Sequence, residues 1–282
     1  MHARRARRPL QRHQSPRRAR GRAGVRIQIN YPVRVGELSY TNTVPFRLDS
    51  RWNITPCPSP RLLTSWAEEG RVDAGVISAV DGWRLEKDFE ALPYGIAARR
   101  QVRSVILFSR RPWNQLTGAV IGLTDQSSTS VRLLRLLLET RDSQKPVFRE
   151  GLAVDDDARL LIGDQALTPT PGLVADYPHQ TDLAAEWNRW QGQPFVFARW
   201  RVRRAVAEFW RRELGEALGT ALDHFDRNRA NTVRASARAL RLSSLDLSAY
   251  FDGLTYRLTD EEAAAEERFR SLLGRAASEV AR

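Results

Sequence analysis

The stretch AVIGLTDQSSTSVRLLRLLL, residues 119–138, joins an apolar run, a polar turn and an amphipathic segment. Its first part, residues 119–123, is short and apolar and ends at turn-forming residues, as a buried strand does. Beyond the turn, apolar side chains recur at the spacing of one helix face, at Val131, Leu134, Leu137 and Leu138. We therefore expect a strand over 119–123 and a helix over 128–140, which together form one βα unit.

The same alternation continues in both directions from this unit. We expect further strands at 33–38, 53–57, 74–78, 104–109, 159–162 and 195–198, and helices at 60–69 and 182–190. After Trp200 the sequence predicts helices at 202–216, 218–228 and 231–240, a short strand at 254–258, and a last helix. That helix opens with Thr259 and Glu262, which have the spacing of a capping box. Alternating strands and helices favour an α/β fold with mixed, mainly parallel sheets.

Two apolar runs, 105–108 and 195–198, bracket the middle third of the chain. If both are crossover strands, the middle third forms one lobe and the outer thirds combine into the other. We therefore predict lobe I from residues 27–108 plus 198–282 and lobe II from residues 109–197. A ligand cleft is expected between the lobes, since ligands of open α/β sheets collect outside the carboxyl ends of the strands.

The positive charge of the chain is concentrated at its beginning. The net charge is +12, from 45 basic and 33 acidic residues, but residues 1–26 hold ten arginines and no acid. We predict that this Arg-rich tail is disordered, because it has almost no apolar residue to bury. A nucleic-acid arm is the alternative interpretation of the tail. Without the tail the chain is almost neutral, so we expect neither a nucleic-acid nor a membrane partner.

Composition also argues against several kinds of site. Cys57 is the single cysteine, which excludes an intramolecular disulfide and a site built from several thiolates. Outside the tail only His179 and His224 remain, at a spacing that matches no zinc motif. We therefore expect no metal. No apolar run reaches the length of a membrane span and no secretory signal is recognisable, so we expect a cytoplasmic protein.

The clearest local signal for chemistry is the hydroxyl-rich turn that precedes the helix at 128–140. Ser127, Ser128, Thr129 and Ser130 are consecutive there. The N-terminus of a helix has unpaired N–H groups and a partial positive charge, so it suits a carboxylate or phosphate. Plain helix capping is the structural alternative, because Ser and Thr are favoured at such positions for that reason alone. The glycines of a nucleotide-binding loop are missing, which disfavours a nucleoside triphosphate.

Three more polar positions lie next to expected strands. Asn42 follows the first strand, in a segment that also holds Tyr40 and Thr43, and it could bind a ligand or simply cap a helix. Ser104 begins one strand and Asp164 follows another. Each of these two could be an ordinary turn residue. Their convergence where a cleft between lobes is expected is what makes them candidates.

Five blocks of the sequence, in order, resemble the chorismate dehydratase family of the futalosine route to menaquinone. The similarity covers roughly residues 33–273. The matching blocks are VGELSYTNTVP (35–45), LPYGIA (92–97) running to VRSV (102–105), SSTS (127–130), IGDQAL (162–167) and GQPFVFA (192–198). One departure is Thr41, where the family usually has an apolar residue.

This resemblance implies a fold like that of the type II periplasmic binding proteins, in which two α/β lobes close on a ligand. It implies a cytoplasmic hydro-lyase that converts chorismate into 3-[(1-carboxyvinyl)oxy]benzoate and water, with no metal or organic cofactor. The family pattern points to Asn42 and Ser104 as catalytic residues. Substrate-binding residues are then expected at Tyr40, Thr43, Ser127, Ser128, Thr129, Ser130 and Asp164. We expect the enzyme to be a monomer or a weak homodimer.

The residues expected to be catalytic include no conventional base. Asn does not titrate, and no activating partner for Ser104 is evident. The enolpyruvyl carboxylate of the substrate could itself take the proton. Two other functions stay open: a non-catalytic cytoplasmic protein that binds a small carboxylate, and the sister enzyme that makes a dihydroxynaphthoate. The catalytic histidine expected of the sister enzyme is poorly matched, because His179 lies outside every matching block.

Overall fold

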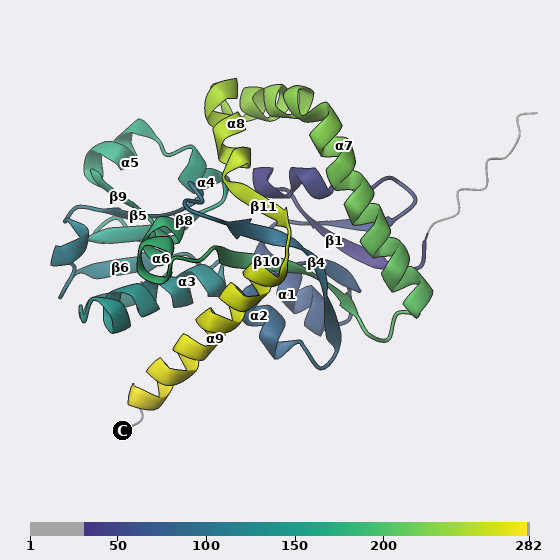
Figure 1. Cartoon of the computed structure of the whole chain (residues 1–282). Helices are drawn as coiled ribbons and strands as arrows, with labels where there is room; N and C mark the ends of the chain where they lie inside the picture. The colour runs from purple at the N-terminus through teal and green to yellow at the C-terminus, as the bar shows by residue number, and fades with distance from the viewer. Residues whose placement is uncertain (1–30, 281–282) are drawn as a thin grey trace, which may run out of the picture.

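Two mixed β-sheets form the centre of the computed structural model, which describes residues 31–280 (Figure 1). The six-stranded sheet has the order β11-β4-β10-β3-β1-β2. Its strands are β1 (Arg34–Leu38), β2 (Asn53–Cys57), β3 (Ala74–Ser78), β4 (Phe89–Ala98), β10 (Phe195–Arg203) and β11 (Leu254–Arg257). The five-stranded sheet has the order β7-β6-β8-β5-β9. Its strands are β5 (Val105–Ser109), β6 (Val120–Leu123), β7 (Val147–Glu150), β8 (Ala158–Ile162) and β9 (His179–Asp182).

Both sheets combine parallel and antiparallel pairs. In the described chain, β1 is parallel to β2 and β3, and β6 is parallel to β7 and β8. The other pairs are antiparallel, so parallel pairing does not predominate as expected. In the six-stranded sheet, β10 inserts between β3 and β4 against their direction and β11 runs antiparallel to β4, and in the five-stranded sheet β5 runs antiparallel to both of its neighbours.

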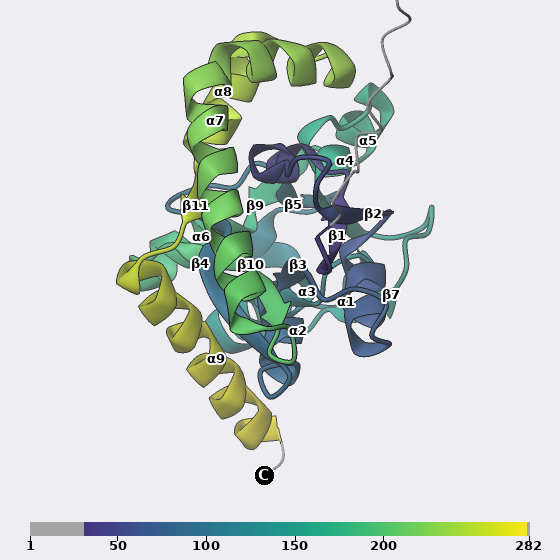
Figure 2. The same ribbon diagram turned by 90° about the vertical axis from the view of Figure 1, so that its right-hand side faces the viewer.

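Helices cover the faces and ends of the two sheets. They are α1 (Pro60–Glu68), α2 (Ala79–Arg84), α3 (Ser128–Arg135), α4 (Asp164–Leu167), α5 (Pro171–Asp176), α6 (Leu183–Gln191), α7 (Glu208–Leu240), α8 (Ser244–Asp252) and α9 (Asp260–Val280). A π-helical turn, Leu136–Arg141, continues α3, and 3-10 turns occur at Thr41–Phe46 and Trp113–Gln115. The long helix α7 packs against the 3-10 turn Thr41–Phe46 and against α8 (Figure 2).

The long C-terminal helix α9 is fixed to the six-stranded sheet by polar contacts in its second turn. Glu266 is buried there and forms an ion pair with Arg199 of β10 at 3.0 Å, while Trp83 Nε1 donates to the same carboxylate at 2.9 Å. The expected capping box forms in part: the N–H of Thr259 donates to the Glu262 carboxylate at 2.9 Å, while the Thr259 hydroxyl accepts from the N–H of Glu261 at 3.3 Å and not from that of Glu262. The C-terminal segment is therefore part of the six-stranded half of the molecule.

Several expected elements differ from those observed. The helices expected at 202–216 and 218–228 form one helix that begins only at Glu208, because residues 202–203 belong to β10. The backbone leaves the helical region at Asn228, where α7 has a kink, so the helix end expected at this residue agrees with the structure. The strands β4, β7 and β9 and the helices α2, α4, α5 and α8 were not expected at all. Strand β4 is the largest of these omissions, because it pairs with both β10 and β11.

Strand pairing bears on the predicted lobes. The run 105–108 lies in the five-stranded sheet, paired with β8 and β9, whereas 195–198 lies in the six-stranded sheet. The chain therefore passes between the sheets at residues 99–104 and again at 192–194. The division into two lobes stays a prediction. If each lobe contains one sheet, the chain first passes from one lobe to the other before Val105, because β5 belongs to the five-stranded sheet. The predicted tail, residues 1–26, lies outside the described residues.

Candidate active site

A cavity of about 60 Å³ lies between the two sheets. Its apolar wall combines residues of both sheets and of the first crossing, including Leu38, Val76, Ile96, Val102, Val105, Ile162 and Phe197. Its polar wall consists of Tyr40, Asn42, Thr43, Ser78, Ser104, Ser127 and Ser130. The carboxyl end of β3 and the segments just after β1, β6 and β8 all contribute, as expected for strands whose carboxyl ends meet at one cleft.

Asn42 reaches the cavity from the 3-10 turn that follows β1. Its Oδ1 atom is buried and has no hydrogen-bond partner among residues 31–280. The turn itself is fixed by the Thr43 hydroxyl, which lies 2.7 Å from the carbonyl oxygens of both Leu38 and Tyr40. A buried acceptor without a partner is unusual in a folded protein. A ligand that donates a hydrogen bond would satisfy it.

Tyr40 and Thr41 link this turn to the five-stranded sheet. The Tyr40 phenol donates to Gln126 Oε1, and the backbone N–H of Thr41 donates to Asp164 Oδ1 at 3.1 Å. Burial raises the pKa of Tyr40 to about 12, so the phenol stays protonated at neutral pH. Burial likewise raises the pKa of Asp164, against the Thr41 hydrogen bond. Asp164 does not line the cavity, and its observed contact holds the two sheets together.

The hydroxyl-rich turn divides its side chains among three roles. Ser127 caps α3 by accepting from the N–H of Ser130 at 3.2 Å, and their two hydroxyl oxygens lie 3.0 Å apart on the cavity wall. Thr129 is fully buried and accepts from the N–H of Val80 at 3.0 Å, which ties α3 to α2. Ser128 lines the cleft on the other side of the turn. Capping and cavity lining therefore coexist in this turn.

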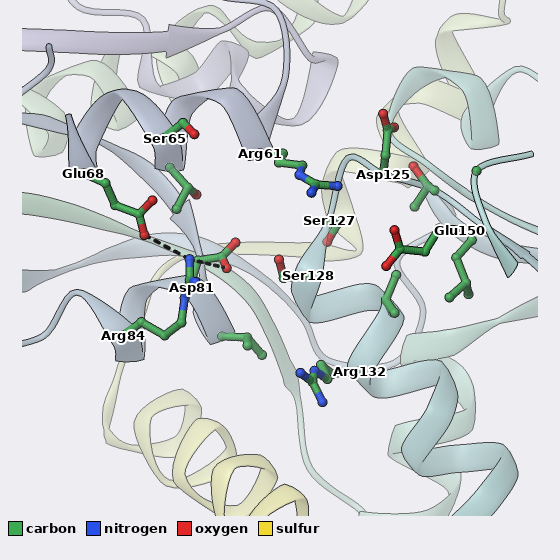
Figure 3. Close-up of a pocket in the computed structure, with 16 residues that line it drawn as sticks. Arg61, Ser65, Glu68, Asp81, Arg84, Asp125, Ser127, Ser128, Arg132 and Glu150 are labelled. Carbon is green, nitrogen blue, oxygen red and sulfur yellow. Dashed lines mark hydrogen bonds and ion pairs between the residues drawn. The ribbon is translucent and has the colours of Figure 1, made fainter. Parts of the chain in front are cut away.

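That second cleft is shown in Figure 3. It shares Ser127 with the cavity, and its walls are formed by one side of α1, by α2, by the start of α3 and by the ends of β6 and β7. Its charged residues have both signs: Arg61, Arg84 and Arg132 face Glu68, Asp81, Asp125 and Glu150. Arg84 forms ion pairs with Glu68 at 3.1 Å and with Asp81 at 3.3 Å. This mixture favours neither an anion nor a cation.

Ser104 stands where the chain enters the five-stranded sheet, and it is only 1% exposed. Its carbonyl oxygen accepts from the N–H of Gly163 at 2.8 Å, and its hydroxyl lies 3.0 Å from the phenol of Tyr250. Just before it, Arg103 has a φ of 57°, in the left-handed region. Ser104 is thus presented by a backbone turn that L residues rarely adopt.

Asp182 holds this unusual turn. Its carboxylate accepts from the N–H groups of Val102 at 3.0 Å and of Arg103 at 2.7 Å, and also caps α6 through Ala184 and Ala185 at 2.9 and 3.1 Å. Burial raises the pKa of Asp182, although all four N–H groups oppose that shift. One carboxylate therefore connects the first crossing between the sheets to α6.

The turn at Arg103 leads to a prediction on stability. Arg103→Gly should raise the free energy of unfolding by about 1 kcal/mol, because an L residue in the left-handed region costs roughly 1–2 kcal/mol and glycine regains part of that. Urea unfolding measures the change. The control is Arg100→Gly, at an exposed position without a positive φ. If Arg103→Gly were no more stable than Arg100→Gly, the strain assigned to Arg103 would be wrong.

Three further residues at the site were missed by the sequence analysis. Ser78 lines the cavity and accepts from the N–H of Asp81 at the start of α2, and its place at the end of an expected strand was a usable signal. Asp182 was recognised only as the start of a helix. Tyr250 lies about 150 residues from Ser104 along the chain, so no local pattern could connect them.

The two described histidines lie away from the cavity. His179 belongs to β9 and His224 is exposed on α7, and neither lines the cavity. Among residues 31–280 there is no cluster of three or more His, Cys, Asp or Glu side chains that could hold a metal ion. The same part of the chain contains no helix with the length and apolar character needed to cross a membrane.

Comparisons with known proteins agree with this architecture. A chorismate dehydratase from Thermus thermophilus is 28% identical over 273 residues, which cover 86% of this chain and 96% of that protein. A solved structure from Archaeoglobus fulgidus has a TM-score of 0.69 at 17% identity, covering 87% of this chain and 97% of that one. The periplasmic aliphatic sulphonate binding protein SsuA from Escherichia coli has a TM-score of 0.59 at 15% identity over 87% of each chain.

The two solved structures confirm the expected fold class, an α/β fold like that of the periplasmic binding proteins. A family model described as menaquinone biosynthesis matches residues 33–275. This match extends from just before β1 into α9, and it includes all the strands and the whole cavity wall. The chain therefore belongs to the menaquinone biosynthesis family.

Proposed function

We propose that the protein is a chorismate dehydratase, which converts chorismate into 3-[(1-carboxyvinyl)oxy]benzoate and water. The observation that carries the proposal is a cavity walled by hydroxyl and amide groups of both sheets, with one buried acceptor, Asn42 Oδ1, left unpaired. Membership in the menaquinone biosynthesis family and the similarity to the Thermus enzyme support it.

The reaction requires a proton to leave C3 of the ring and a hydroxyl to leave C4. The C3 proton is acidic because the resulting negative charge spreads through the ring onto the ring carboxylate. Fixed donors aimed at that carboxylate lower the barrier, and more so in a cavity that excludes water. Ser104, Ser127, Ser130 and the N-terminus of α3 are the groups that we assign to the carboxylates of the substrate.

Asn42 is assigned to the departing hydroxyl. Its unpaired Oδ1 can accept the hydrogen of the C4 hydroxyl, which fixes the C–O bond in one orientation. Such a contact would also satisfy an acceptor that is otherwise costly to bury. Thr43 acts indirectly, because its hydroxyl is occupied with the turn that carries Asn42.

The proton acceptor is assigned to the substrate itself. Among the described residues that line the cavity, Tyr40 is the single titratable side chain, and its raised pKa of about 12 makes the neutral phenol unsuitable as a base. The enolpyruvyl carboxylate takes the C3 proton and delivers it to the departing hydroxyl. The C–H and C–O bonds break, water forms, and no proton is taken from the protein.

A flat pH profile is the expected consequence. Between roughly pH 6 and pH 9, kcat should change by less than about twofold, because no group of the cavity titrates in that range. Tyr40 would lose its proton only near its raised pKa of about 12. Steady-state rates in buffers of matched ionic strength provide the test. A bell-shaped profile centred near neutral pH would indicate a protein base and contradict this assignment.

The experiment for the function itself is incubation of the purified protein with chorismate, without added metal or cofactor. Liquid chromatography with mass detection should show loss of chorismate and formation of the dehydrated aromatic product in proportion to enzyme, above a blank without enzyme. If chorismate stayed intact but raised the melting temperature, the protein would be a carboxylate-binding module. If it had neither effect, the assignment to chorismate would be wrong.

An alternative enzyme and the remaining properties of the protein also belong to this proposal. The sister dihydroxynaphthoate synthase is disfavoured because neither described histidine lines the cavity. We assign the enzyme to the cytoplasm and to a monomeric or weakly dimeric state, with no cofactor and no nucleic-acid or membrane partner. Cell fractionation and size-exclusion chromatography with light scattering test these assignments.

A further inference from the structure

We propose that Tyr250 is a positioning residue that orients the hydroxyl of Ser104 toward the substrate, an inference that rests on the proposed function. Tyr250 lies on α8 and is only 1% exposed. It does not line the cavity, yet its phenol oxygen is 3.0 Å from Ser104 Oγ. Tyr250 can therefore influence a bound ligand through Ser104 and not by direct contact.

The direction of this hydrogen bond follows from acidity. A phenol is a far stronger acid than a serine alcohol, so the phenol donates and Ser104 Oγ accepts. Burial also raises the pKa of Tyr250, which keeps the phenol protonated as a donor. Because Oγ already accepts from Tyr250, the hydrogen of Ser104 is free to point into the cavity. It can then donate to a carboxylate of the substrate.

The Ser104 hydroxyl is also a stronger hydrogen-bond donor when it is paired with Tyr250 than it would be alone. A hydroxyl that accepts one hydrogen bond becomes a better donor in the next, because chains of hydrogen bonds polarise one another. The backbone of Ser104 is fixed separately, by Gly163 at its carbonyl and by Asp182 at the preceding N–H groups. Removal of the Tyr250 hydroxyl should therefore change the orientation of the Ser104 hydroxyl without moving its backbone.

The test variant is Tyr250→Phe, which removes one oxygen atom and keeps the buried ring. We expect kcat to fall about tenfold with KM changed less than about twofold, since an oriented donor acts mainly in the transition state. The matched control is Tyr256→Phe. Tyr256 is a second buried tyrosine outside the cavity, and its hydroxyl has no partner among the described residues. Its loss should leave kcat unchanged.

A double-mutant cycle with Ser104→Ala separates positioning from a general structural role. If Tyr250 acts through Ser104, the double variant Ser104→Ala/Tyr250→Phe should be no slower than Ser104→Ala alone. A loss that multiplies in the double variant, or a Tyr250→Phe enzyme with wild-type kcat, would overturn the inference while chorismate turnover by the wild type still stands.

The inference can still be tested if the wild-type protein shows no turnover or if Tyr250→Phe does not fold. Absence of turnover by the wild-type protein would overturn the proposed function and this inference with it. If Tyr250→Phe failed to fold, a fluorinated tyrosine would be incorporated at position 250. This keeps the shape and the hydroxyl but makes the phenol a stronger acid, and kcat should then change by more than about twofold. An unchanged kcat in that variant would overturn the inference.

Discussion

Replacement of Asn42 by alanine should lower kcat by about 100- to 1,000-fold, the range found when one preorganised transition-state contact is removed. Asn42 is the polar residue of the cavity whose buried Oδ1 is left without a partner, so its contact with the substrate has no internal substitute. Product formation measured by liquid chromatography, at substrate concentrations well above KM, gives the change in kcat.

Two observations make this test specific. Asn53→Ala provides the control, because Asn53 is exposed on β2 and lies outside the cavity, so its loss should not change kcat. Chorismate should still raise the melting temperature of Asn42→Ala, since the groups assigned to the carboxylates remain. Full turnover by Asn42→Ala would remove the role assigned to this residue and leave the Ser104 and Ser127 assignments to be tested separately.

Replacement of Asp182 by alanine should cause the largest loss of stability, about 4 kcal/mol. The substitution leaves four backbone N–H groups without their acceptor, two at the first crossing between the sheets and two at the start of α6. Loss of an N-cap costs about 1 kcal/mol, and each buried donor left unsatisfied costs roughly 1–3 kcal/mol. For a chain of this size the melting temperature should fall by about 10 °C.

The matched control is another N-cap, Thr170, which accepts a single hydrogen bond from the N–H of Leu173 at 3.2 Å at the start of α5. Thr170→Ala should cost only about 1 kcal/mol. The difference between the two variants measures what Asp182 contributes at residues 102–103. If Asp182→Ala were no less stable than Thr170→Ala, the hydrogen bonds of Asp182 to residues 102–103 would contribute nothing to the free energy of unfolding. Calorimetry of both variants decides between these results.

Local sequence patterns predicted most of the buried strands. They failed where pairing with neighbouring strands, or packing against other elements, outweighs the local preference of the residues. Strand β4 contains Pro93 and Gly95, which weaken a strand in isolation, and it exists because β10 and β11 pair with it on both sides. Conversely, the break expected between residues 216 and 218 is absent, because α7 continues through it and packs against the 3-10 turn Thr41–Phe46. The helix end expected at Asn228 coincides with the kink in α7.

For the candidate site too, the sequence predicted which residues lie near the cavity but not which way each side chain points. Asn42, Ser104 and the turn 127–130 could be found from the sequence, because polar residues at strand ends collect at one edge of an α/β sheet. Helical spacing brings Ser127 and Ser130 to one side of their turn and sends Thr129 to another. Which side faces the cavity depends on how α3 packs against α2, and the Thr129–Val80 contact reflects that packing.

The α/β class, the family resemblance and the polar residue types suited to binding carboxylates could all be inferred from periodicity and short motifs, whose information is local. Three long-range contacts are seen only in the folded chain: Asp164 joins the sheets, Asp182 holds the turn before Ser104, and Tyr250 meets the Ser104 hydroxyl. Those contacts join residues 79–146 positions apart, and chain folding brings them together because burial of the shared core offsets the entropy of closing such long loops.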